Sequence, residues 1–226
     1  MNKKHKFTNQ FNMKILKEAP FKLAIAFALV FSIYDMKAQV GTNLGALNPN
    51  LATESELEVL PNLNAKLAGS IVENRPFLSM SKFHDFLKEY LNEDQSKELY
   101  PKLFIPINLN ATTRNEILLV PGVGNKMAHE FEEYKPYKAM AQFHREIGKY
   151  VDDTELARLE QFVFVPINLN EASDDDILSI PGLGNRMLHE FKEYRPYKSI
   201  VQFRREIGKY VDDNEVARLE RYLVLE

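Results

Sequence analysis

The sequence of 226 residues contains no cysteine, which excludes disulfide bonds and thiolate metal sites. It also lacks a long apolar run: the longest, residues 23–34, has twelve residues, whereas a membrane-spanning helix needs about twenty. We find no nucleophile–base pair, no pair of catalytic carboxylates, no P-loop and no His-Glu-x-x-His motif. We therefore expect a protein that is not an enzyme and uses no cofactor, metal or small-molecule substrate.

The first 39 residues form a separate region. Six lysines precede the apolar run: Lys3, Lys4, Lys6, Lys14, Lys17 and Lys22. A basic stretch, a short apolar core and small residues at its end predict a secretory signal peptide, cleaved near Ala38 or Gln39. We expect an exported protein, periplasmic or secreted. The alternatives are an uncleaved membrane anchor over residues 1–39 and a start at Met13 in place of Met1.

Excess positive charge is absent from the rest of the chain. Residues 40–226 keep 22 of the 29 basic residues and 30 of the 32 acidic ones, a net charge of −8. Proteins that coat themselves in nucleic acid are usually basic. The charge therefore argues against that mode of binding.

A sixty-residue repeat organises residues 40–226. Residues 107–166 and 167–226 match at 35 of 60 positions without a gap, so they are close duplicates. Residues 40–106 hold a degenerate copy, which keeps the register over 47–106 at these positions: Asn48, Asn50, Thr53, Glu56, Pro61, Lys66, Ala68, Pro76, Phe83, His84 and Tyr90. The repeat predicts three tandem units of one fold.

Each unit has the pattern of short helices. Ser173 is placed to cap a helix whose first turn is Asp174–Asp176, and an acidic first turn suits a helix cap better than a metal site. Thr53 with Glu56 and Thr113 with Glu116 have the spacing of a capping box. No stretch alternates like a strand except the brief "FVFVP" after residue 161, so the sequence predicts an all-α fold.

A Pro-Gly-x-Gly turn ends that first helix, and a second helix follows at once. Its apolar residues, Met187, Leu188, Phe191 and Tyr194, have helical spacing, and Pro196 ends it. We expect two more helices within residues 199–210 and 213–225.

The third unit from "INLNEASDDDILSIPGLGNRMLHEF" to "KEYRPYKS" resembles the helix-hairpin-helix unit of the competence protein ComEA and its relatives. The shared pieces are the Asn-x-Asn lead, the Ala-Ser cap, the Pro-Gly-x-Gly hairpin, the basic residue two places on and the Tyr-Arg-Pro-aromatic segment. The likeness covers residues 107–139 and 167–199 well and 47–79 poorly. It implies a compact, SAM-like unit of two hairpins, although Tyr-Val-Asp-Asp replaces the second Gly-x-Gly.

The resemblance also implies a ligand, the phosphate backbone of double-stranded DNA, held by main-chain N–H groups without reading the base sequence. The turn leads into a helix N-terminus, which favours an anion. Carried over by position, the candidate DNA contacts are Gly122, Gly124, Asn125 and Lys126, with Gly182, Gly184, Asn185 and Arg186.

The turn glycines also have a purely structural explanation, because a short corner between helices needs a residue with positive φ. In the first unit, Asn62 and Asn64 replace both glycines. Asparagine tolerates a left-handed turn, so we expect the corner to form there while its side chains crowd a phosphate. We expect this unit to fold and to bind DNA poorly, although Lys66 is kept.

Other repeated residues have plainer explanations. His129 and His189 offer one imidazole per unit, too few for a zinc site, so we expect helix positions. The aromatic sets have core spacing: Phe131, Tyr134, Tyr137, Phe143, and Phe191, Tyr194, Tyr197, Phe203. The later basic residues are interleaved with acids and are expected to be ion-paired: Arg145, Lys149, Arg158, Arg204, Arg205, Lys209, Arg218 and Arg221.

Two functions remain open from the sequence. One is an exported, sequence-independent binder of double-stranded DNA, as in DNA uptake. The other is a non-enzymatic helical adaptor whose hairpins contact proteins of a secretion, uptake or pilus-like assembly; the acidic balance favours this one.

Overall fold

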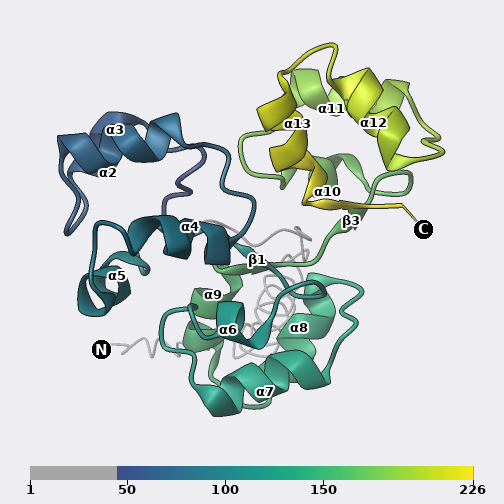
Figure 1. Ribbon diagram of the computed structural model, residues 1–226. Helices are drawn as coiled ribbons and strands as arrows, with labels where there is room; N and C mark the ends of the chain where they lie inside the picture. The colour runs from purple at the N-terminus through teal and green to yellow at the C-terminus, as the bar shows by residue number, and fades with distance from the viewer. Residues whose placement is uncertain (1–44, 226) are drawn as a thin grey trace, which may run out of the picture. The chain divides into compact units, whose positions relative to one another are not determined.

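The computed structural model describes residues 45–225, which are mostly helical with a few short strands (Figure 1). These residues belong to one compact unit. The predicted signal peptide, residues 1–39, lies outside the described residues. Within residues 45–225, no helix has the length and apolar character that crossing a membrane requires.

Four helices lie in each of three stretches, which we call the first (45–106), second (107–166) and third (167–225) segments. The first has α2 (Glu54–Glu58), α3 (Ala65–Glu73), α4 (Met80–Leu87) and α5 (Glu93–Leu99). The second has α6 (Arg114–Ile117), α7 (Asn125–Glu133), α8 (Met140–Ile147) and α9 (Asp153–Glu160). The third has α10 (Asp174–Leu178), α11 (Asn185–Glu193), α12 (Ile200–Ile207) and α13 (Asp213–Glu220). Each helix of the second and third segments begins 60 residues after its counterpart in the preceding segment, which is the register of the sequence repeat.

Short parallel pairings join the two ends of each segment; they are few and short, so the mostly helical structure is compatible with the predicted all-α fold. β1 (Ile107–Asn108) pairs with β2 (Val163–Phe164), and β3 (Ile167–Asn168) pairs with β4 (Leu223–Val224). In the first segment a single bridge joins Leu47 to Leu103. The helix expected over 213–225 therefore ends at Glu220, because the apolar residues after it pair with a strand far back in the sequence.

Side-chain caps explain where several helices begin. The capping boxes of Thr53 with Glu56 and of Ser173 with Asp176 are both complete, so the acidic first turn of α10 is a cap as predicted. The box expected for Thr113 and Glu116 is only half formed. Thr113 caps α6, but the Glu116 carboxylate accepts bonds from Thr112 Oγ1 (2.9 Å) and from the backbone N–H of Ser81 (3.0 Å).

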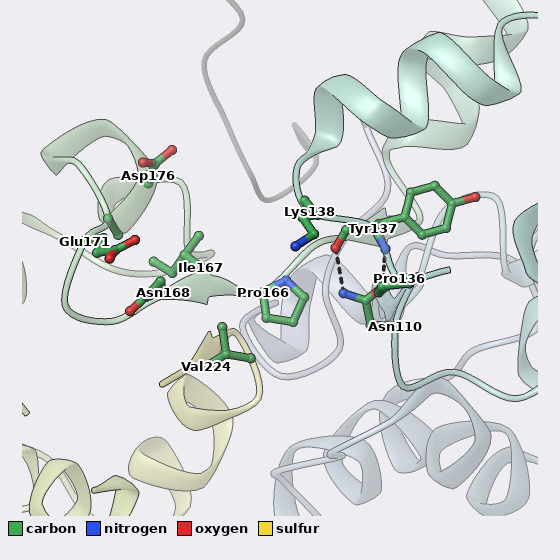
Figure 2. Close-up of a pocket in the computed structure, with 11 residues that line it drawn as sticks. Asn110, Pro136, Tyr137, Lys138, Pro166, Ile167, Asn168, Glu171, Asp176 and Val224 are labelled. Atoms are coloured by element: carbon green, nitrogen blue, oxygen red, sulfur yellow. Dashed lines mark hydrogen bonds between the residues drawn. The ribbon is translucent and has the colours of Figure 1, made fainter. Parts of the chain in front are cut away.

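The Asn-x-Asn lead holds the loop that follows the long helix of each segment. Asn110 donates to the carbonyl of Tyr137 (2.8 Å) and accepts from its N–H (2.7 Å), as Figure 2 shows. Asn50 bonds Phe77 in the same way, and Asn170 bonds Tyr197. One amide side chain therefore satisfies both backbone groups of an aromatic residue whose ring lies in the core.

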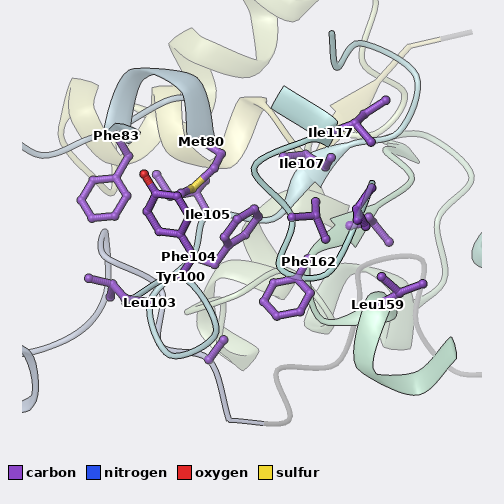
Figure 3. Packing of buried hydrophobic residues seen from close by; sticks show 14 of the residues in the cluster. Met80, Phe83, Tyr100, Leu103, Phe104, Ile105, Ile107, Ile117, Leu159 and Phe162 are labelled. Atoms are coloured by element: carbon purple, nitrogen blue, oxygen red, sulfur yellow. The ribbon is translucent and has the colours of Figure 1, made fainter. Parts of the chain in front are cut away.

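Aromatic rings pack across both joints between segments. Phe104, at the end of the first segment, meets Phe162 of the second edge to face at 5.0 Å (Figure 3). Phe164, sixty residues later, meets Tyr222 of the third at 4.6 Å. The first two segments share one buried hydrophobic cluster, whereas the third has its own, which also includes Phe164 of the second.

Candidate functional site

The turn between α6 and α7 has the geometry that the Pro-Gly-x-Gly pattern predicts. Gly122 has φ of +78°, a left-handed conformation that glycine adopts without steric cost. The four candidate residues of this turn, Gly122, Gly124, Asn125 and Lys126, are all exposed. The corresponding turn between α10 and α11 matches it: Gly182 has φ of +79°, and Gly184, Asn185 and Arg186 are exposed.

The second glycine of each turn is in a different position. Gly124 precedes α7 with φ of −102° and ψ of 179°, an extended backbone that any residue adopts. A Cβ placed on Gly124 or Gly184 would meet no atom within 4 Å. Within the described residues, neither backbone strain nor packing therefore requires glycine at these two positions.

The helix N-termini behind the turns lack side-chain caps. Gly124 and Gly184 are the N-cap residues of α7 and α11 and have no side chain to accept from the first turn. In an α-helix the opening N–H groups have no partner within the helix, and the dipole makes this end positive. Lys126 and Arg186 stand on the first turn of these helices, and neither forms an ion pair with another described residue. The arrangement offers N–H donors and one cation to an anion from outside.

The first segment forms the same corner with asparagine. Asn62 takes the left-handed conformation, with φ of +62°, as the sequence predicted. Asn64 does not share it: it has φ of −139°, and its side chain accepts from the N–H of Leu67 at 3.0 Å. Asn64 therefore fills, within the protein, the first-turn acceptor position that is open at Gly124 and Gly184.

The surroundings of the two glycine turns differ. The methyl carbons of Leu51 lie 2.9 and 3.3 Å from the point that a Cβ on Gly182 would occupy, so a first-segment side chain lies against the third-segment turn. At Gly122 the neighbouring group is the guanidinium of Arg158.

A cavity of about 740 Å³ opens beside the second-segment turn. Residues 118–123 line one side, and His84, Lys88, Lys97 and Tyr100 are on the other. Burial raises the pKa of Tyr100 to about 12, and its hydroxyl lies 2.5 Å from His84 Nδ1. Burial also lowers the pKa of His84, with a smaller contribution from Lys88. Both lysines have acidic partners, Asp85 and Glu93, so this wall adds little net charge.

The repeated aromatic residues form core, as expected. Phe131, Tyr137 and Phe143 are at most 2 % exposed, and so are their counterparts Phe191, Tyr197 and Phe203. Tyr134 and Tyr194 are partly buried, and their hydroxyls bond Tyr150 and Tyr210. No stacking platform for bases forms from these rings.

The histidines and most of the later basic residues also match the expectation. His129 and His189 are exposed on α7 and α11, each near the glutamate four residues on. Arg145 and Lys149 share Glu146, and Arg205 and Lys209 share Glu206.

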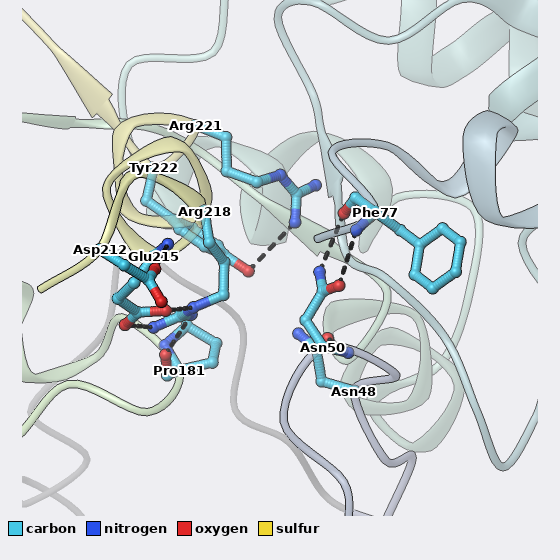
Figure 4. Close-up of polar contacts among 9 residues, drawn as sticks. All are labelled: Asn48, Asn50, Phe77, Pro181, Asp212, Glu215, Arg218, Arg221 and Tyr222. Atoms are coloured by element: carbon cyan, nitrogen blue, oxygen red, sulfur yellow. Dashed lines mark hydrogen bonds and ion pairs between the residues drawn. The ribbon is translucent and has the colours of Figure 1, made fainter. Parts of the chain in front are cut away.

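Two of the basic residues depart from the expected solvated faces. Arg218 is 2 % exposed; it bonds Glu215 through two nitrogens and the carbonyl of Pro181 at 2.6 Å (Figure 4). Arg221 bonds the carbonyl of Pro106 at 2.7 Å and lies over the Phe164 and Tyr222 rings. The bonds to the carbonyls of Pro181 and Pro106 join residues 37 and 115 positions apart in the sequence, so the local pattern of charges could not predict them.

Comparison of the chain with protein-family models, with curated proteins and with solved structures finds no match. The function is therefore inferred from the residues of this chain.

Proposed function

We propose that the protein is built of three tandem helix-hairpin-helix units and binds double-stranded DNA without sequence preference. The phosphates would be held by the N–H groups of the turns at 121–126 and 181–186, with Lys126 and Arg186 adding charge-assisted contacts. The proposed activity is binding alone, with no chemical step and no cofactor.

One observation carries the proposal: Gly124 and Gly184 are glycines for which the fold gives no reason. Each has an extended backbone and open space where a side chain would be. A glycine in such a place lets a ligand approach the backbone closely. The resemblance to the ComEA-type hairpin supplies the identity of that ligand, a DNA phosphate.

The net charge of −8 over residues 40–226 limits how the proposed binding can work. Long-range attraction is not available, so contact has to be local, at the turns, and the affinity modest. Non-specific binders have dissociation constants of about 10⁻⁴ to 10⁻⁶ M at physiological salt.

A titration of the full chain with duplexes of unrelated sequence, at several salt concentrations, tests the proposal. We expect equal affinities for all duplexes and a log–log salt slope of about −0.9 for each phosphate contacted. No binding at about 50 mM salt, where phosphate contacts are strongest, would refute the proposed function.

A second candidate is the helical adaptor, in which the hairpins contact protein in a secretion, uptake or pilus-like assembly. The observation that favours it is Leu51, an apolar side chain that lies on the Gly182 turn. The same turn can therefore accept a protein side chain. Capture of an assembly partner by a chain that binds no DNA is the expected result of this alternative.

We further propose that the protein acts outside the cytoplasm, in a place consistent with DNA uptake. The support is the signal-peptide pattern of residues 1–39. Mass spectrometry of the protein from its native host should find an N-terminus near residue 39 or 40. An intact N-terminus in the membrane fraction would indicate an anchor.

A further inference from the structure

The last helix of each segment carries one residue that faces the hairpin turn. In the second segment this residue is Arg158 of α9: its Nη2 lies 2.9 Å, and its Cζ 3.6 Å, from the point that a Cβ on Gly122 would occupy. In the third segment it is Arg218 of α13, whose Nη2 lies 3.3 Å from the same point on Gly182. A guanidinium thus lies against the left-handed glycine of both intact turns.

The first segment reverses this charge. Sixty residues before Arg158 the sequence has Glu98, and Asn62 donates to its Oε2 at 3.0 Å. The turn residue and the residue facing it therefore change together. Glycine faces arginine in the second and third segments, whereas asparagine faces glutamate in the first. Backbone geometry explains asparagine at the left-handed position, but it does not require a negative charge on α5.

Arg158 is held in place and still reaches solvent. Glu155 accepts from its Nε and its Nη2, both at 2.6 Å, which fixes the plane of the guanidinium. The bond to Glu155 raises the pKa of Arg158, so it stays charged. Its side chain is 33 % exposed, against 3 % for Arg218, which is also bonded to the carbonyl of Pro181. An anion on the second-segment turn can reach Arg158, whereas Arg218 is enclosed.

We infer that Arg158 is a phosphate-contacting residue of the 121–126 turn, and that Glu98 excludes phosphate from the first turn. This inference rests on the proposed DNA binding. It makes the second-segment turn the principal site, with the N–H donors of the α7 N-terminus and the cations of Lys126 and Arg158. It also explains why Lys66, kept in the first segment, does not suffice: Glu98 opposes its charge, and Asn64 already occupies the first-turn acceptor position.

The test compares Arg158→Gln with Arg145→Gln in the full chain, by DNA titration over a range of salt. Arg145 is the matched control, because it is also an exposed arginine paired with a glutamate, and it lies on α8 and not among the atoms nearest to Gly122. A lost phosphate contact lowers the log–log salt slope by about one, which a packing defect does not do. We expect Arg158→Gln to weaken binding about tenfold with that change of slope, as for one charge-assisted contact, and Arg145→Gln to bind like the parent chain.

A second variant adds a site instead of removing one. Asn62→Gly, Asn64→Gly and Glu98→Arg together give the first turn both glycines and the facing arginine of the second, at exposed or partly exposed positions. We expect tighter binding and a steeper salt slope. If circular dichroism shows that Arg158→Gln does not fold, the binding of the triple variant tests the inference by itself.

The outcomes separate the two claims. If the parent chain binds no DNA, the proposed function fails. The second outcome is that the parent chain binds DNA, that Gly124→Asn weakens this binding, and that Arg158→Gln binds as well as Arg145→Gln. In that case the proposed function stands, and Arg158 is only a packing residue. Unchanged binding by the triple variant would likewise overturn the role given to Glu98.

Discussion

The hairpin turns of the second and third segments have the same sequence pattern, Pro-Gly-x-Gly-Asn followed by a basic residue. They also have the same left-handed glycine. Their neighbours differ. Gly122 has a partly exposed arginine beside it, whereas Gly182 has a buried arginine and the side chain of Leu51. Near-identical copies in one chain are therefore not equivalent sites, because contacts from distant residues decide what reaches each turn.

The strongest way to test this comparison is to give each turn the asparagines of the first segment. Gly122→Asn with Gly124→Asn should reduce DNA affinity at least tenfold, because a side-chain oxygen then occupies the anion position. Gly182→Asn with Gly184→Asn should reduce it only two- to threefold, roughly, because that turn is already partly covered. Affinity is measured by titration, and circular dichroism checks that helicity is kept, as Asn62 leads us to expect. Equal losses from both pairs would show that the surroundings do not matter.

Truncating the Leu51 side chain, which lies against the third-segment turn, should have a smaller effect on DNA affinity, and in the opposite direction. Leu51→Ala, made in the Gly122→Asn, Gly124→Asn background, leaves the third-segment turn as the remaining glycine site. We expect affinity to rise a few-fold, roughly, since a truncated side chain no longer blocks the approach of a duplex to Gly182. Val59→Ala is the matched control, because Val59 is 82 % exposed on another turn and its loss should change nothing. Unchanged affinity in the Leu51 variant would mean that Leu51 does not restrict access.

A third difference between the copies depends on pH. His144 of the second segment faces Glu160 at 3.1 Å, and Arg204 of the third bonds Glu220 through two nitrogens. The bond to Glu160 raises the pKa of His144, so its contribution to stability is complete below the unfolded value of about 6.5 and is lost as pH rises through the folded value. Arginine stays charged throughout this range.

We therefore expect the unfolding temperature of the parent chain to fall between about pH 6 and pH 8, and His144→Arg to remove that fall. His84, the counterpart in the first segment, acts in the other direction, because burial lowers its pKa and its contribution is lost as pH falls. The double variant His84→Gln, His144→Arg separates the two. A rise of the unfolding temperature with pH that appears in His144→Arg and disappears in the double variant would be assigned to His84.

The sequence predicted what depends on neighbours along the chain. A residue with positive φ in each turn and the cap at Ser173 follow from a few adjacent letters, and both were confirmed, at positions 62, 122 and 182 and at the start of α10. Glu116 was predicted to cap its own helix, and it instead bonds Ser81, 35 residues earlier. The sequence pattern places Arg158 among several ion-paired surface residues, whereas its position beside Gly122 depends on α9 packing against the turn.

The smallest expected effect concerns stability, and it separates the fold of the turn from its function. Asn64 caps α3 through the N–H of Leu67, and Gly124 leaves α7 without such a cap. Gly124→Asn should raise the free energy of unfolding by a few tenths of a kcal/mol, since asparagine and glycine differ by about that much as N-caps. Asn64→Gly should lower it by a similar amount. Chemical denaturation measures both, and Gly124→Asn should at the same time weaken DNA binding. A stabilised chain that binds less well is the expected result only if glycine at 124 serves a ligand; a destabilised chain would mean that glycine at 124 serves the fold.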